Sequence, residues 1–198
     1  MSAIESHPLR PFVPAHAQLL LLGSFPPPRE RWSLDFFYPN YINDMWRVMG
    51  LVWHADRLWF VDEARRTFRI ERIVPFLEAQ GIALYDTATR VRRLRQNASD
   101  KYLEVVAPTD IVAITSQMPQ LRAIATTGQR ATDTLLAHLQ ARGIEVSEPP
   151  MGGCSPVVVG DRTLLLFRMP STSRAYPLAL QRKAETYAAM FRQLGMLP

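Results

Sequence analysis

The sequence predicts an α/β fold with a mainly parallel central sheet. Short runs of apolar residues alternate with longer segments whose apolar residues recur at helical spacing. Strands buried on both faces of a parallel sheet read as continuous apolar runs, and alternation with helices is typical of a sheet covered on both sides. With 198 residues, 47% of them hydrophobic, we expect residues 1–198 to form one domain, with residues 1–10 poorly ordered.

Three apolar runs are the predicted parallel strands, and a glycine or a carboxylate follows each of them. The runs are residues 19–22, 82–85 and 121–127. Residues 157–159 and 163–167 flank Gly160-Asp161, a pair typical of a hairpin turn. Because ligands bind beyond the carboxyl ends of strands in such sheets, we expect the site to follow Leu22, Tyr85, Thr126 and Arg168.

Four segments carry helical patterns between or after these strands. They are residues 43–49, 70–80, 131–141 and 178–194. Asn43 or Asn40 can cap the first helix, and Gly81 can end the second. Pro75 lies inside the second segment, so we expect that helix to bend or be interrupted there.

The chain carries a moderate positive charge, +5 at pH 7 with a pI near 9.8. Of its 23 basic residues only Lys101 and Lys183 are lysines, and the remainder are arginines. Arginine forks suit phosphate oxygens, which favours a polyanionic partner such as DNA. A genome rich in GC also favours arginine codons, so both explanations stay open.

Composition excludes several other classes of protein. Cys154 is the only cysteine, which excludes an internal disulfide and a four-cysteine metal site. The four histidines show no ligand spacing, so we expect no metal and no cofactor. No run of about 18 apolar residues and no signal peptide stand out, so we expect a cytoplasmic protein without a membrane span. One contiguous core suggests a monomer.

Two segments at or near the end of the first strand carry candidate chemistry. Residues 23–28 form a loop of one glycine, Ser24, Phe25 and three prolines, in which glycine permits close approach and proline stiffens the backbone. Residues 36–46 hold five aromatic side chains and two asparagines. Aromatic faces can stack on a nucleobase and amides can pair with its edge, although some of these rings are expected in the core.

Two further segments are suited to phosphate. Residues 169–177 place small hydroxyls and Arg174 between the last strand and the last helix, where they can grip a phosphate or simply cap the helix. An arginine cluster follows the second strand, and it either binds DNA or forms a solvated face. The cluster consists of Arg90, Arg92, Arg93 and Arg95.

Taken together, these segments resemble the uracil-DNA glycosylase superfamily. The closest branch is that of the hypoxanthine-DNA glycosylases, which are related to mismatch-specific uracil glycosylases. That branch has a G-S-F/M-P-G loop, then H-P-R-N-x-F-W, a G-I-x-L-W-D segment and a late L-P-S-T-S. The corresponding segments here are residues 22–26, 39–46, 81–86 and 170–173, and the resemblance extends from about Leu19 to Phe191.

The resemblance implies a three-layer αβα sandwich and a nucleotide flipped out of DNA into a pocket. It assigns Asn43 to the attacking water and Ser24 to the catalytic loop. It further implies base-binding residues, which are Gly23, Phe25, Pro26, Phe37 and Thr127. DNA-binding residues are Pro170, Ser171, Thr172, Ser173, Arg174 and Tyr176, and the strand-end cluster adds Arg92 and Arg93. Because neither lysine falls in a motif, we expect a monofunctional glycosylase that acts on uracil or hypoxanthine.

The sequence also departs from the family pattern. Phe25 stands where many members have Asp or Asn, Met169 replaces a histidine, and Thr127 stands where relatives often have a base-reading asparagine. These departures leave open a catalytically inactive DNA-binding protein of the same fold. A hydrolase that uses Ser24 or Ser171 as a nucleophile is a further alternative, although no G-x-S-x-G motif is present.

Overall fold

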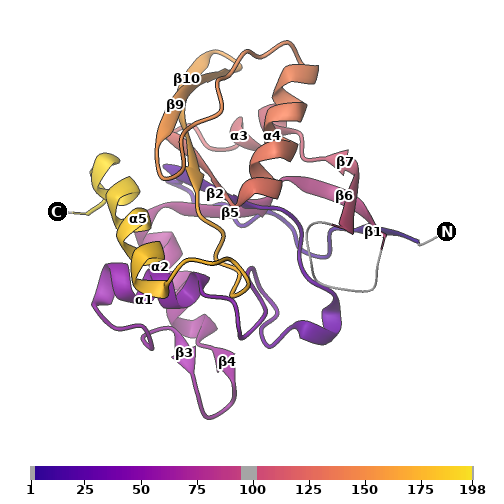
Figure 1. The fold of residues 1–198 in the computed structure, drawn as a ribbon. Coiled ribbons are helices and arrows are strands. Elements are labelled where there is room, and N and C mark those ends of the chain that lie inside the picture. The colour runs from indigo at the N-terminus through magenta and orange to yellow at the C-terminus, as the bar shows by residue number, and fades with distance from the viewer. Residues whose placement is uncertain (1–2, 95–101, 198) are drawn as a thin grey trace.

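The computed structural model describes residues 3–94 and 102–197, which form an α/β fold around a five-stranded sheet (Figure 1). The strand order is β5-β2-β8-β10-β9. Their bounds are Leu19–Gly23 for β2, Ile82–Asp86 for β5, Ala123–Thr127 for β8, Cys154–Val159 for β9 and Arg162–Met169 for β10. The first four strands in this order pair in parallel, whereas β9 is antiparallel to β10, so the sheet is mixed.

Helices lie on both sides of this sheet. Those between β2 and β5 are α1 (Met45–His54) and α2 (Ile70–Gln80); later in the chain come α3 (Ile111–Thr115), α4 (Gln129–Ala141) and α5 (Leu180–Gln193). From β2 the chain first steps outward to β5 and then returns past β2 to β8. Right-handed crossovers therefore place α1 and α2 on one face and α3 and α4 on the other, as Figure 1 shows.

Several smaller elements lie outside the main sheet and its helices. A 3-10 turn covers Arg29–Arg31, and β3 (Val61–Asp62) with β4 (Thr67–Phe68) forms a short hairpin. A second sheet has the order β1-β6-β7, built from Ile4–Ser6, Ala88–Arg93 and Leu103–Pro108. The sequence pattern predicted none of these strands, because their burial is partial and their pairing is antiparallel. The partner of β1 is in addition far away in the sequence, since Ile4 pairs with Arg92.

Two expectations need correction. Residues 1–10 were expected to be poorly ordered, but Ile4–Ser6 pairs with β6, and Glu5 forms an ion pair with Arg93 at 2.9 Å. The backbone bonds and the ion pair supply the order that composition did not reveal. Of the bend or interruption expected at Pro75, the interruption does not occur: helix α2 continues through this residue, because packing of the buried Ile73 and Leu77 stabilises it.

The core is centred on β2, whose four leucines are fully buried between the helical layers. No helix of the described residues is long and apolar enough to cross a membrane.

Leu21→Ala should lower the free energy of unfolding by about 2–5 kcal/mol, because it leaves a cavity at a fully buried site. Val158→Ala on β9, where the side chain is 54% exposed, is the matched control and should change stability by less than about 0.5 kcal/mol. Urea unfolding followed by circular dichroism checks both values. Equal losses would contradict the assignment of β2 to the centre of the core.

Candidate active site

A cavity of about 640 Å³ opens at the carboxyl edge of the main sheet. It lies where the strand order reverses around β2, the position at which α/β sheets bind ligands. The first loop, the aromatic segment, the end of β5, the end of β8 and the loop before α5 all contribute to its wall. These segments are far apart in the sequence and meet because parallel strands end at one edge.

Most of the predicted site residues line this one cavity. They are Gly23, Ser24, Phe25, Pro26, Phe37, Asn43, Thr127, Ser171, Thr172, Ser173, Arg174 and Tyr176. The wall also contains Tyr38 and Asp86, which sequence reasoning did not select. The strand-end rule therefore brings most of the predicted residues to one cavity, and their functional roles stay predictions.

Asn43 is held at the start of α1 by its own side chain. Its Oδ1 accepts a hydrogen bond from the backbone N–H of Met45 at 2.8 Å. Its backbone carbonyl and that of Tyr41 accept hydrogen bonds from Arg47 Nη1 at 3.0 and 2.8 Å. Because the side-chain oxygen is used by the helix terminus, the amide N–H₂ group is the part of Asn43 that can serve a ligand.

A buried ion pair joins the Asn43 segment to the loop before α5. Lys183 Nζ lies 2.9 Å from Asp44 Oδ2 and donates to the carbonyl of Ser173 at 2.9 Å. The backbone N–H of Asp44 donates to the carbonyl of Thr172 at 2.8 Å. Lys183 is 1% exposed, so its amine serves structure and cannot reach a substrate; Lys101 lies outside the described residues.

The loop before α5 is held in place by close packing and by hydrogen bonds. Gly128, at φ 116°, follows β8, and a Cβ there would lie 3.1 Å from the Cβ of Ser171. Tyr187 donates to the carbonyl of Pro170 at 3.0 Å, which anchors the start of the loop. Pro170 itself does not line the cavity, whereas Arg174 is exposed at its rim.

Asp86 and His7 form a pair at the inner wall of the cavity. His7 Nε2 donates to Asp86 Oδ2 at 2.8 Å, and the two side chains are 2% and 10% exposed. The ring of His7 packs against Phe25, Phe37 and Tyr85 at centroid distances of 5.3, 6.3 and 4.7 Å. Sequence reasoning missed His7 because it lies in the segment expected to be poorly ordered, and it passed over Asp86 because one carboxylate after a strand is a weak signal.

Tyr38 supplies a neutral hydroxyl to the same wall. Its Oη lies 3.1 Å from Thr127 Oγ1, and Thr127 in turn donates to the carbonyl of Leu22. Burial raises the pKa of Tyr38 well above its usual value, and the nearby Asp86 carboxylate raises it further. Tyr38 adopts φ 51°, a left-handed conformation that a bulky side chain seldom takes, so the surrounding structure imposes this placement.

Arg92 and Arg93 lie in β6 and hold local structure. Arg92 pairs with Glu104 at 2.7 Å, and Arg93 pairs with Glu5 and donates to the carbonyl of Pro26 at 2.6 Å. Neither lines the cavity, and their contact with DNA stays a prediction. Arg95 lies outside the described residues.

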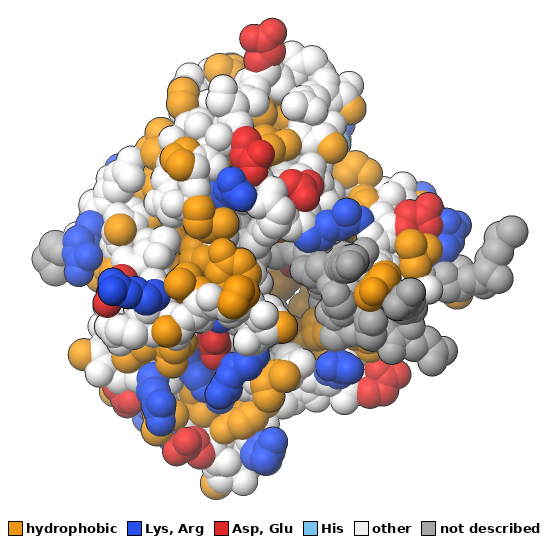
Figure 2. Space-filling model, viewed as in Figure 1, with side chains coloured by type: hydrophobic (Ala, Val, Ile, Leu, Met, Phe, Trp, Pro, Cys, Tyr) orange, Lys and Arg blue, Asp and Glu red, His pale blue; other side chains and the backbone are white. Residues whose placement is uncertain are grey.

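The distribution of charged side chains and of possible metal ligands limits the kinds of ligand that the protein can bind. On the face shown in Figure 2, cationic side chains are spread among apolar and acidic ones instead of forming one continuous patch. Residues 3–94 and 102–197 contain no group of three or more His, Cys, Asp or Glu side chains placed to hold a metal ion. Met169, at the position where the resemblance implied a histidine, is fully buried in the core.

No protein-family model matches the chain, and no curated protein matches its sequence. A solved structure does match: the solution NMR structure of a protein from Methanosarcina acetivorans, provisionally named a uracil DNA glycosylase. The TM-score is 0.64 at 21% identity, and the match covers 98% of this chain and 99% of that chain. The two chains share a fold. The likeness extends over nearly the whole length of both chains.

Lys183→Met should destabilise the protein by about 3–5 kcal/mol, because it leaves the Asp44 carboxylate buried without its partner. Arg182→Ala is the matched control: its ion pair with Glu185 is exposed and should contribute less than about 1 kcal/mol. Thermal and urea unfolding measure both variants. A loss in Lys183→Met as small as that of the control would show that the buried pair does not hold the two loops.

Proposed function

We propose that this protein is a monofunctional DNA glycosylase that hydrolyses the N-glycosidic bond of a deaminated base, uracil or hypoxanthine, flipped out of DNA. The observation that carries the proposal is one cavity formed jointly by the first loop, the Asn43 segment and the loop before α5. The shared fold with the Methanosarcina acetivorans protein supports it. In this proposal the helices on the two faces make a single-domain, three-layer αβα sandwich.

The cavity suits a flipped nucleobase in size and lining. Its volume of about 640 Å³ lies within the range of small-molecule sites. Phe25 and Phe37 offer aromatic surface for stacking, while Tyr38 and Thr127 offer hydroxyls to the edge of a base. A hydroxyl can donate or accept, so this lining is compatible with both uracil and hypoxanthine.

The reaction needs a positioned water and stabilisation of the departing base. Glycosidic cleavage develops positive charge on the sugar and negative charge on the base, as in glycoside hydrolysis. The amide N–H₂ of Asn43 orients the attacking water. The first loop lines the cavity at Ser24 and Phe25, and in this proposal its backbone N–H groups stabilise the developing charge on the base.

The rim of the cavity is proposed to hold the DNA backbone. Ser171, Thr172 and Ser173 supply hydroxyl and backbone groups to a phosphate, as small residues do at many DNA contacts. Arg174 and Tyr176 occupy the same rim and can fill the gap that the flipped nucleotide leaves. With Lys183 buried, the proposed reaction stops at an abasic site and does not proceed through a lysine adduct.

Asn43→Ala should lower the rate of base release about 100-fold or more, because it removes the group that orients water. The measurement is strand cleavage by alkali after incubation with labelled duplexes that contain uracil, hypoxanthine or a mispaired thymine. Gln140→Ala, which removes an exposed amide on α4 away from the cavity, is the control and should retain the wild-type rate.

This assay separates the alternatives when DNA binding and ester hydrolysis are measured beside it. Base release that is equal in wild type and Asn43→Ala would keep the enzyme class but overturn the role of Asn43. No release from any duplex, with DNA still bound, would favour the catalytically inactive DNA-binding protein. Cleavage of a simple ester without action on DNA would favour a serine hydrolase instead.

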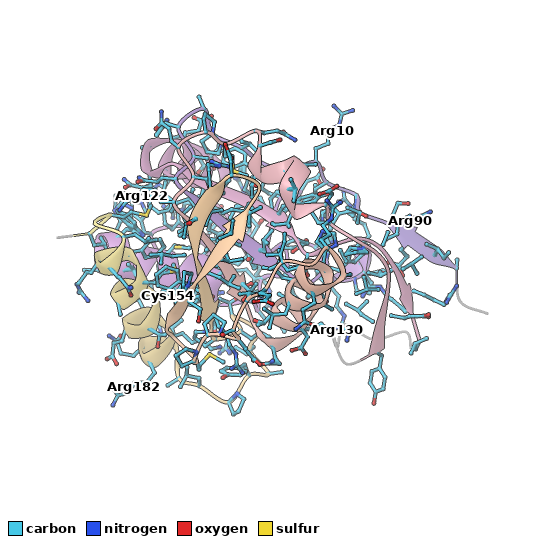
Figure 3. All side chains as sticks on the ribbon, turned by 90° about the horizontal axis from the view of Figure 1, so that it is seen from above. Arg10, Arg90, Arg122, Arg130, Cys154 and Arg182 are labelled. Carbon is cyan, nitrogen blue, oxygen red and sulfur yellow. The ribbon has the colours of Figure 1, made fainter. Side chains whose placement is uncertain are left out.

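Arg174→Ala should weaken DNA binding and reduce the slope of log K against log salt by about 0.9, the effect of one lost phosphate contact. Arg122→Ala is the control, because Arg122 precedes the amino end of β8 and so lies at the edge of the sheet opposite the cavity. Figure 3 shows Arg122 and Arg90 at opposite ends of the molecule. Fluorescence anisotropy over a series of salt concentrations measures both slopes, and equal slopes would place Arg174 off the phosphate path.

A further inference from the structure

We propose that Asp86, held in place by His7, is the carboxylate that accepts the proton of the attacking water. The inference rests on the proposed glycosylase function and assigns a catalytic residue that the motif resemblance did not select. His7 is a positioning residue in this assignment, because it acts on the reaction through Asp86.

Asp86 is well placed for this role. Of the described residues that line the cavity, it is the one with an acidic side chain. It ends β5 directly beside Gly23 at the end of β2, since the two residues pair in the parallel register. The residue as a whole is 7% exposed, so its charge acts in a largely water-excluded environment.

Gly23 makes room for this carboxylate. A Cβ at position 23 would lie 2.2 Å from Asp86 Oδ1 and 3.7 Å from Tyr38 Oη. Any side chain at this position would therefore push the carboxylate away from the first loop. Glycine is required here by the close approach of Asp86 to the loop that faces the base.

His7 fixes which oxygen of Asp86 is used. The His7 ring donates from Nε2 to Oδ2, which leaves Oδ1 as the oxygen over Gly23. The opposite ring nitrogen, Nδ1, lies 2.8 Å from the carbonyl oxygen and 3.1 Å from the amide nitrogen of Leu9. Three aromatic rings pack around the imidazole, so neither ring nor carboxylate can turn freely.

The chemistry requires a group of this kind. The amide of Asn43 can orient water but cannot take its proton, because an amide is not basic. As the water oxygen bonds to C1′ of the sugar, the C1′–N bond breaks and its electron pair leaves with the base. The water proton passes to Asp86 Oδ1, and the base anion is protonated by that proton or by solvent. The carboxylate also offsets the positive charge that develops on the sugar.

The negative charge of Asp86 also acts on Tyr38, which lies in the same cavity wall. After burial, the Asp86 carboxylate is the second cause that raises the pKa of the Tyr38 hydroxyl. The charge of Asp86 therefore reaches the part of the cavity wall where the base is proposed to lie. A carboxylate whose only role is to tie His7 to the sheet would not need to face the cavity.

Asp86→Asn tests the assignment with an isosteric side chain that cannot accept a proton. Single-turnover base release should fall about 100- to 10,000-fold, while affinity for a duplex with a non-hydrolysable 2′-fluoro nucleotide should change less than about threefold. Asp133→Asn, on the exposed face of α4, is the matched control and should keep the wild-type rate. In Asp86→Ala, added formate should restore part of the lost rate, whereas it should not restore Asn43→Ala.

His7 variants keep the test decisive if the Asp86 variants fold poorly. His7→Gln retains an N–H donor and should lose less than about tenfold in rate, whereas His7→Phe should lose substantially more at similar thermal stability. A wild-type rate in Asp86→Asn, the absence of formate rescue, or equal rates in the two His7 variants would overturn the assignment. In each of these cases, base release by the wild-type protein would still support the proposed glycosylase function. If the wild-type protein released no base, both the glycosylase function and the role of Asp86 would be overturned.

Discussion

The close approach of Gly23 and Asp86 is the constraint on which the rest of the site depends. Parallel pairing of β2 with β5 brings these two residues to the same edge of the sheet, and a missing Cβ lets the carboxylate lie against the first loop. His7, Tyr38 and Thr127 are then arranged around that carboxylate by hydrogen bonds and ring packing. The sheet order thus decides which chemical groups share the cavity, and the loops decide their final positions.

A second constraint acts from the opposite wall. Burying two opposite charges is unfavourable when the desolvation free energy exceeds their Coulombic attraction. Further hydrogen bonds to the charged groups are needed to offset this penalty. Lys183 meets this condition, because it binds both Asp44 and the carbonyl of Ser173. The main role of the ion pair is therefore to fix the distance between the Asn43 segment and the loop before α5. Its net contribution to the free energy of unfolding is a weaker argument for its presence.

The sequence allowed the parallel strands, the edge of the sheet at which the cavity opens and most of the cavity lining to be predicted, because apolar runs are a direct signal of buried strands. It did not allow the small sheet to be predicted, since the partners of β6 depend on pairings that local pattern does not encode. Arg92 and Arg93 looked like a phosphate-binding cluster, yet their partners Glu104 and Glu5 could be known only from that pairing. His7 was hidden for the same reason, because it directly follows β1, whereas the left-handed backbone of Tyr38 has no signal in the residue pattern.

The Lys183–Asp44 pair also has a consequence for the order of events during synthesis. Asp44 is made early, but its partner belongs to α5, 139 residues later in the chain. On the ribosome, a nascent chain therefore carries an unpaired Asp44 until α5 has emerged. Until then the loop before α5 also lacks its contact with Lys183. An incomplete product that ended before this helix would lack the contact that joins the Asn43 segment to the loop before α5, so these two walls of the cavity would not be held together.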